Sequence, residues 1–129
     1  MTVLSAATVA LLGYSLSILT WSTLDLASWS QLEVWADLST GALALVLVPA
    51  AVLVRVRIPG GIPLACAGLA GLQAINLHNS MHMHGEIAYV AEGARAVFGG
   101  VVLWLAWAGG RAEAKREEGA ASCGSPTQT

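Results

Sequence analysis

One stretch decides the fold class: residues 3–21 read VLSAATVALLGYSLSILTW and contain no charged side chain. A helix needs about 20 mostly apolar residues to cross a bilayer core about 30 Å thick, so this stretch is long enough to span one. It ends on Trp21, and tryptophan rings prefer the headgroup layer of a membrane. The stretch therefore predicts a transmembrane helix close to the amino terminus.

Three more apolar stretches follow the first one, over residues 36–54, 62–81 and 87–108. Of the 129 residues of the chain, 56% are hydrophobic and 11% are charged, whereas soluble domains carry about 25% charged residues. We therefore expect an all-α integral membrane protein with a bundle of four transmembrane helices within residues 1–110.

Two segments outside these stretches have a different composition. Residues 22–39 carry acidic side chains among tryptophans, which indicates a short segment lying in the membrane interface after the first helix. Residues 111–129 begin with a run of charges and end in small polar side chains. This composition predicts a charged and disordered cytoplasmic tail.

The distribution of lysine and arginine predicts how the bundle sits in the membrane. Arg55 and Arg57 lie between the second and third stretches, and Arg111, Lys115 and Arg116 lie in the tail. All five fall on one side of a four-span bundle, and the side richer in Lys and Arg is the cytoplasmic one. We expect a multi-pass protein of the cytoplasmic membrane of a prokaryote, with both termini inside and an acidic outer face.

All three histidines of the chain fall in one window, LHNSMHMHGE, at the outer end of the third span. On a helix, His78 and His82 share a face and Met81 lies beside them. On an extended chain, His82 and His84 point the same way, with Glu86 next in line. Imidazole binds Cu or Zn and thioether selects Cu(I), so the window is a candidate Cu or Zn site. The other interpretation is interfacial structure, in which these side chains bind headgroups and water. Haem is not expected, because no other span supplies a histidine.

Polar residues inside two spans form a second candidate site. Glu92 and Arg95 are spaced i,i+3 on the fourth span, and Gln73 and Asn76 lie on the third. Ionisable groups within a membrane usually face a bundle interior or a wet cavity and often mark an ion or proton path. The alternative is that Arg95 reaches the outer headgroups and Glu92 neutralises it.

Small residues predict which spans are neighbours. Ala67 with Gly71 on the third span, and Ala96 with Gly100 on the fourth, have the spacing that lets helix backbones approach closely in lipid. We expect the third and fourth spans to pack together, and we expect the bundle to associate with copies of itself or with other membrane subunits.

Three functions remain after the motifs are considered. The net charge of −2 and the lack of a basic stripe argue against nucleic acid as a partner, and no hydrolase or nucleotide-binding motif occurs. We expect a binding or accessory role in the bilayer rather than catalysis, with the outward His/Met/Glu cluster as a Cu or Zn site. The alternatives are a non-catalytic small subunit of a larger respiratory or oxidase-type complex, and a small oligomeric ion- or proton-coupled transporter that uses Glu92.

Overall fold

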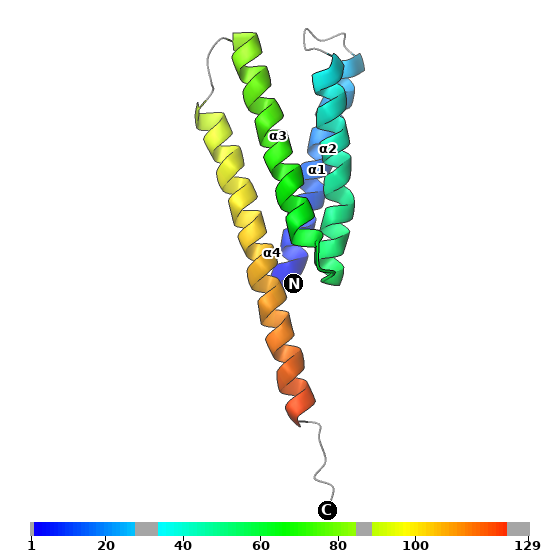
Figure 1. The fold of residues 1–129 in the computed structure, drawn as a ribbon, viewed down its shortest axis with the longest axis vertical. Coiled ribbons are helices and arrows are strands. Elements are labelled where there is room, and N and C mark those ends of the chain that lie inside the picture. The colour runs from blue at the N-terminus through cyan, green and yellow to red at the C-terminus, as the bar shows by residue number, and fades with distance from the viewer. Residues whose placement is uncertain (1, 28–33, 85–88, 124–129) are drawn as a thin grey trace, which may run out of the picture.

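The computed structural model of the chain describes residues 2–27, 34–84 and 89–123, which form four helices. They are α1 (Val3–Ala27), α2 (Val34–Val56), α3 (Gly61–His84) and α4 (Tyr89–Cys123). The helices run up and down side by side, and the amino terminus, the α2–α3 turn and the end of α4 share one end (Figure 1). Because α1 contacts α2, α2 contacts α3, α3 contacts α4 and α4 returns to α1, the helices close a ring. The all-α architecture is confirmed.

Three of the described helices are long and apolar enough to cross a membrane: Val3–Ala27, Val34–Val56 and Tyr89–Ala120. The remaining helix, α3, has 24 residues and is also long enough to cross a membrane. It is less apolar than α1 and α2, because its second half carries Gln73, Asn76 and His78. Large apolar side chains, such as Leu16 at 60% and Val97 at 66% exposure, point away from the bundle, as is typical of surfaces that contact lipid.

The α1–α2 connection differs from the expected interfacial segment. Residues 22–27 continue α1, residues 34–39 begin α2, and residues 28–33 lie outside the described part of the chain. The Ser22 hydroxyl donates a hydrogen bond of 2.9 Å to the backbone carbonyl of Asp37, so the two helix ends are joined directly. The separate segment predicted over residues 22–39 is therefore wrong for its two described parts, because tertiary contacts extend both helices.

The expectation of a disordered tail from residue 111 is also wrong for residues 111–123, which continue α4 beyond the bundle (Figure 1). This stretch is rich in Ala, Glu, Lys and Arg, which are strong helix formers. The Arg57 guanidinium also forms a bidentate ion pair with the Glu117 carboxylate, and its hydrogen bond lowers the pKa of Glu117. The high charge of residues 111–123 thus predicts disorder, whereas their helix propensity and the contact with Arg57 favour a helix. Residues 124–129 lie outside the described structure.

The α2–α3 turn is a helix C-cap with an unusual occupant. The Ile58 N–H donates to the Leu53 carbonyl at 3.0 Å, and the Arg57 N–H donates to the Val54 carbonyl at 3.2 Å. This pair of bonds defines the Schellman motif, whose left-handed residue is usually glycine. Here Arg57 takes that position with φ 60°, and Gly60 follows with φ 114°. The turn fixes α2 and α3 as antiparallel neighbours.

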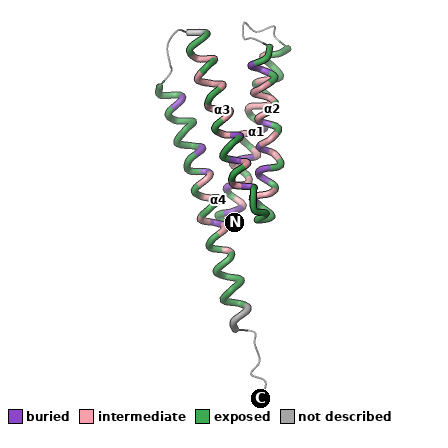
Figure 2. The backbone as a smooth tube through the Cα atoms, in the orientation of Figure 1, coloured by how far each residue is buried: buried purple, intermediate pink, exposed green. Residues whose placement is uncertain are grey.

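The core lies on the inward faces of the helices. Leu11, Leu47, Leu72 and Val102 come from the four different helices and are buried together. The Ser15 hydroxyl is also buried, and it donates to the Ala44 carbonyl at 2.6 Å. The amino-terminal half of α4 is largely exposed (Figure 2). The core thus holds the ring along most of its length and leaves the amino-terminal half of α4 loosely covered.

The small residues pack differently from the expected pattern. Helices α3 and α4 do contact each other. However, a Cβ added at Gly71 would lie 2.9 Å from the Leu43 Cδ1 atom of α2, so this glycine allows α3 to approach α2. A Cβ added at Gly100 would meet no atom of the described chain within 4 Å. The predicted α3–α4 contact is present, but these two glycines do not form it.

Candidate functional site

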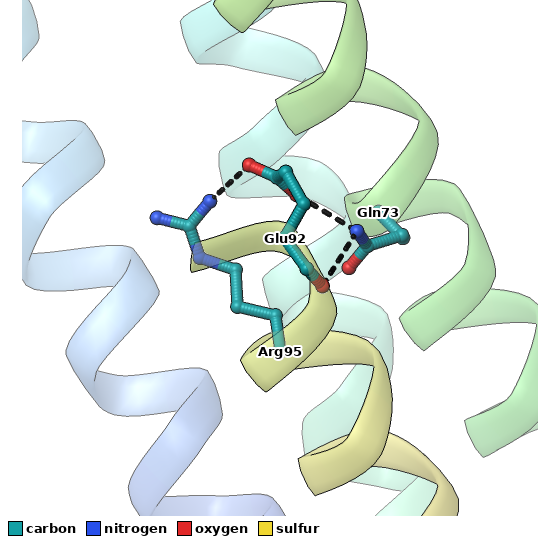
Figure 3. A network of polar contacts seen from close by, with 3 residues as sticks. All are labelled: Gln73, Glu92 and Arg95. Atoms are coloured by element: carbon teal, nitrogen blue, oxygen red, sulfur yellow. Dashed lines mark hydrogen bonds and ion pairs between the residues drawn. The ribbon is translucent and has the colours of Figure 1, made fainter. Parts of the chain in front are cut away.

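A polar network lies between α3 and α4, near the start of α4 (Figure 3). The Glu92 side chain is buried, with 7% of it exposed. The Gln73 Nε2 atom donates to the Glu92 Oε2 atom at 2.7 Å and to the Glu92 backbone carbonyl at 3.2 Å. The Arg95 Nη1 atom donates to the Glu92 Oε1 atom at 2.5 Å. Both carboxylate oxygens of Glu92 are therefore engaged.

Helix geometry explains why this carboxylate can be buried. Glu92 lies in the first turn of α4, where a negative charge interacts favourably with the helix dipole. The i,i+3 spacing puts Arg95 one turn away on the same face, and its side chain remains 43% exposed. A buried charge is tolerated when it is paired and hydrogen-bonded, and Glu92 meets both conditions. The network can thus hold α4 against α3.

Tyr14 is a further residue beside this network, and the sequence did not indicate it. It lies on α1, close enough to Arg95 and Glu92 to interact electrostatically with both. Its ring contacts the Phe98 ring, with a centroid distance of 5.3 Å. A tyrosine in an apolar run carries no spacing signal, so only the packing of α1 on α4 reveals its place.

Asn76 is separate from this network. It lies on α3, one turn beyond Gln73, and is half-buried. Within the described residues no hydrogen bond joins it to Glu92 or Arg95. Of the four residues expected to form a polar pocket, the structure connects Gln73, Glu92 and Arg95.

The histidine window begins on the last turns of α3. The rings of His78 and His82 are stacked, with centroids 6.1 Å apart and planes 9° apart. The Trp35 ring of α2 lies 5.4 Å from the His78 ring, centroid to centroid. Met81 is 54% exposed beside them. The carboxyl-terminal end of α3 therefore presents two imidazoles and one thioether together.

The remaining predicted metal ligands cannot be placed. The side chain of His84 and all of Glu86 lie outside the described residues. Among the residues that the structure describes, no group of three or more His, Cys, Asp or Glu side chains could hold a metal ion. The described candidate site is a histidine pair with an adjacent methionine.

No family model, curated protein or solved structure matches the chain.

Proposed function

We propose that the protein crosses the membrane four times, with both termini on the cytoplasmic side. Three helices have the required length and apolar character. At 1.5 Å per residue, α3 is about 36 Å long, which also suffices to cross the bilayer core. Its polar Gln73 is hydrogen-bonded to Glu92 inside the bundle, which reduces the cost of placing it in lipid. The end with Arg55, Arg57 and Arg111 faces the cytoplasm.

Within this topology, the protein has a binding or accessory role, and its outer histidine pair takes a transition metal, Cu or Zn. The observation that carries this proposal is the stacking of the His78 and His82 rings on one face of α3. Two histidines at i,i+4 form a chelating pair on a helix, and rotation of the side chains aims both rings at one ion about 2.0 Å from each nitrogen. The thioether of Met81 adds a ligand that favours Cu(I). His84 and Glu86 are the nearest further donors in the sequence.

The test is a metal titration of the detergent-purified protein with Cu(I), Cu(II) and Zn(II) against a chromophoric competitor. A His78→Ala/His82→Ala variant is expected to bind at least about tenfold more weakly, because loss of even a group that only hydrogen-bonds to a metal ligand costs about 10–100-fold. An Asn79→Ala variant, between the two histidines, serves as the matched control and retains affinity. Met81→Leu is expected to weaken Cu(I) binding and leave Zn(II) binding unchanged. Equal affinity of the double variant and the control removes the metal site.

A second function, that of a non-catalytic subunit of a larger membrane assembly, is favoured by the outer half of α4. Val90 is 89% and Val97 is 66% exposed. A Cβ at Gly93 or Gly100 would meet no described atom within 4 Å, so another helix could approach this face closely. Native electrophoresis in a mild detergent tests the assembly. Migration solely as a monomer or homo-oligomer contradicts membership of a larger complex.

A third function, ion- or proton-coupled transport, is favoured by the buried Glu92. Its two oxygens are occupied by Gln73 and Arg95, so coupling requires that Arg95, the more exposed partner, releases the carboxylate. The flux of ions or protons into proteoliposomes is expected to be lost in Glu92→Gln and to persist in Asn76→Ala. Equal flux in the two variants rejects Glu92 as the coupling group.

A further inference from the structure

A cavity of about 700 Å³ opens at the arginine-rich end of the bundle, away from both candidate sites. It lies between the α2–α3 turn and the point where α4 leaves the bundle, and its walls include Leu4, Ile62, Ala106, Trp107 and Arg111. A cavity of about 300–1,000 Å³ with mostly apolar walls and a few polar groups has the usual form of a small-molecule site. The cavity thus has the volume and the apolar walls of a small-molecule site, together with a guanidinium.

The guanidinium of Arg111 is available to a ligand. Its central carbon lies 4.0 Å from the centroid of the Trp107 ring, a cation–π contact that holds the side chain over the cavity wall. Within the described part of the chain, Arg111 forms no ion pair with a carboxylate. Arg57 also lines the cavity, but its guanidinium is paired with Glu117. Arg111 is therefore the cation that an incoming anion meets.

The position of Arg57 shows how the cavity is kept in shape. A residue with a Cβ in the left-handed conformation costs about 1 kcal/mol more than glycine, yet arginine occupies this C-cap. Its bidentate pair with Glu117 connects the α2–α3 turn to the extension of α4. The two walls of the cavity are thus held together across the opening.

The surrounding charge is complementary to an anion. This end of the described chain carries five basic residues against three acidic ones: Arg55, Arg57, Arg111, Lys115 and Arg116 against Glu113, Glu117 and Glu118. The cavity walls at Gly60, Ile62 and Pro63 are also the start of α3, where the helix dipole is positive. Trp107 marks the headgroup level of a membrane-embedded helix.

From these observations we infer that the cavity binds the headgroup of an anionic phospholipid of the cytoplasmic leaflet. This inference rests on the proposed membrane crossing and is independent of the metal site. The phosphate lies against Arg111, and the glycerol and upper acyl carbons lie along Leu4, Ile62 and Ala106. Basic pockets between membrane helices on the cytoplasmic side favour such lipids over zwitterionic ones. Arginine binds the phosphate of either kind of lipid, but the zwitterionic headgroup also carries a positive charge that the basic surroundings repel.

Native mass spectrometry of the detergent-solubilised protein tests the inference, with phosphatidylglycerol and phosphatidylcholine of identical acyl chains as probes. Phosphatidylglycerol is expected to be retained, and Arg111→Gln is expected to reduce this retention about fivefold. Arg116→Gln is the matched control, because Arg116 faces a separate and smaller cavity of about 180 Å³ with Thr2 and Glu113. Equal retention of the two lipids, or an equal loss in the two variants, overturns a specific site.

A second pair of variants tests the cavity itself without removing a charge. Gly110 lines the cavity, and a Cβ there would meet no described atom within 4 Å, so Gly110→Leu is expected to occupy part of the cavity. Gly119 is equally open but lies outside the cavity, and Gly119→Leu is the control. Phosphatidylglycerol retention is expected to fall only in Gly110→Leu, with the helical circular dichroism of both variants unchanged. Retention in both variants, or equal binding of soluble glycerol phosphate, contradicts a lipid site in this cavity.

Discussion

Replacement of Gly109 by alanine tests the contact that closes the ring of four helices. A Cβ added at Gly109 would lie 2.8 Å from the backbone nitrogen and 3.1 Å from the Cα atom of Leu4. These are backbone atoms of α1 and cannot move aside as the end of a side chain can. The neighbouring Gly110 provides a matched control, because a Cβ there would meet nothing in the described chain within 4 Å.

The difference between the two variants isolates the clash. Both substitutions gain the higher helix propensity of alanine, about 1 kcal/mol. Overpacking at Gly109 costs about 1–3 kcal/mol because α1 and α4 must separate. Gly110→Ala is therefore expected to exceed Gly109→Ala in free energy of unfolding by about 1–3 kcal/mol.

The assay is reversible unfolding in mixed micelles, with the helical circular dichroism signal followed as the fraction of denaturing detergent rises. Each variant is compared with the unchanged protein under the same conditions. Equal free energies of unfolding for Gly109→Ala and Gly110→Ala would refute the close approach of α4 to α1, and with it the closed ring.

Other changes probe the polar network and the α2–α3 turn. Glu92→Ala is expected to lower the free energy of unfolding by about 2 kcal/mol, because two charge-assisted hydrogen bonds are lost, whereas Asn76→Ala changes it by less than about 0.5 kcal/mol. Similar losses in the two variants would contradict the network. Arg57→Gly is expected to be more stable than Arg57→Ala by about 1 kcal/mol, since only the glycine relieves the left-handed φ of 60°. Equal stability in chemical unfolding would contradict that conformation.

The pH dependence of the same turn follows from the hydrogen bond between Arg57 and Glu117. The bond holds the pKa of Glu117 below its ordinary value of 4.5. A lowered carboxyl pKa contributes stability above the ordinary value, and this contribution is lost as the pH falls through the folded pKa. Carbon-13 NMR titration is expected to show the Glu117 pKa rising toward 4.5 in Arg57→Gln. An unchanged pKa would show that the ion pair does not form in solution.

The helices could be predicted from the sequence, because a charge-free run long enough to cross a membrane must satisfy its backbone hydrogen bonds internally and therefore forms a helix. The helix ends were not accessible, since contacts between distant residues determine them. The hydrogen bond from Ser22 to Asp37 joins the part of α1 beyond its predicted end at residue 21 to the first turn of α2. The ion pair of Arg57 with Glu117 lies beside the extension of α4, where composition alone predicted disorder.

Contacts within one helix were also accessible, because spacing fixes them. The i,i+3 pair of Glu92 with Arg95 and the i,i+4 pair of His78 with His82 follow from helix geometry. The contact of Gln73 with Glu92 depends on how α3 and α4 are rotated about their axes, which a spacing rule does not give. Tyr14 is a clearer case, because its place near the network depends on the rotation of α1 and leaves no mark in the local sequence.

In the proposed topology, four crossings place the histidine pair outside and the arginine-rich turn inside. Single cysteines at His82→Cys and Arg57→Cys, in a background without Cys66 and Cys123, test it with a membrane-impermeant thiol reagent on intact cells or oriented vesicles. Position 82 is expected to be labelled from the outside, and position 57 only after the membrane is opened. Labelling of both positions from the same side would contradict it.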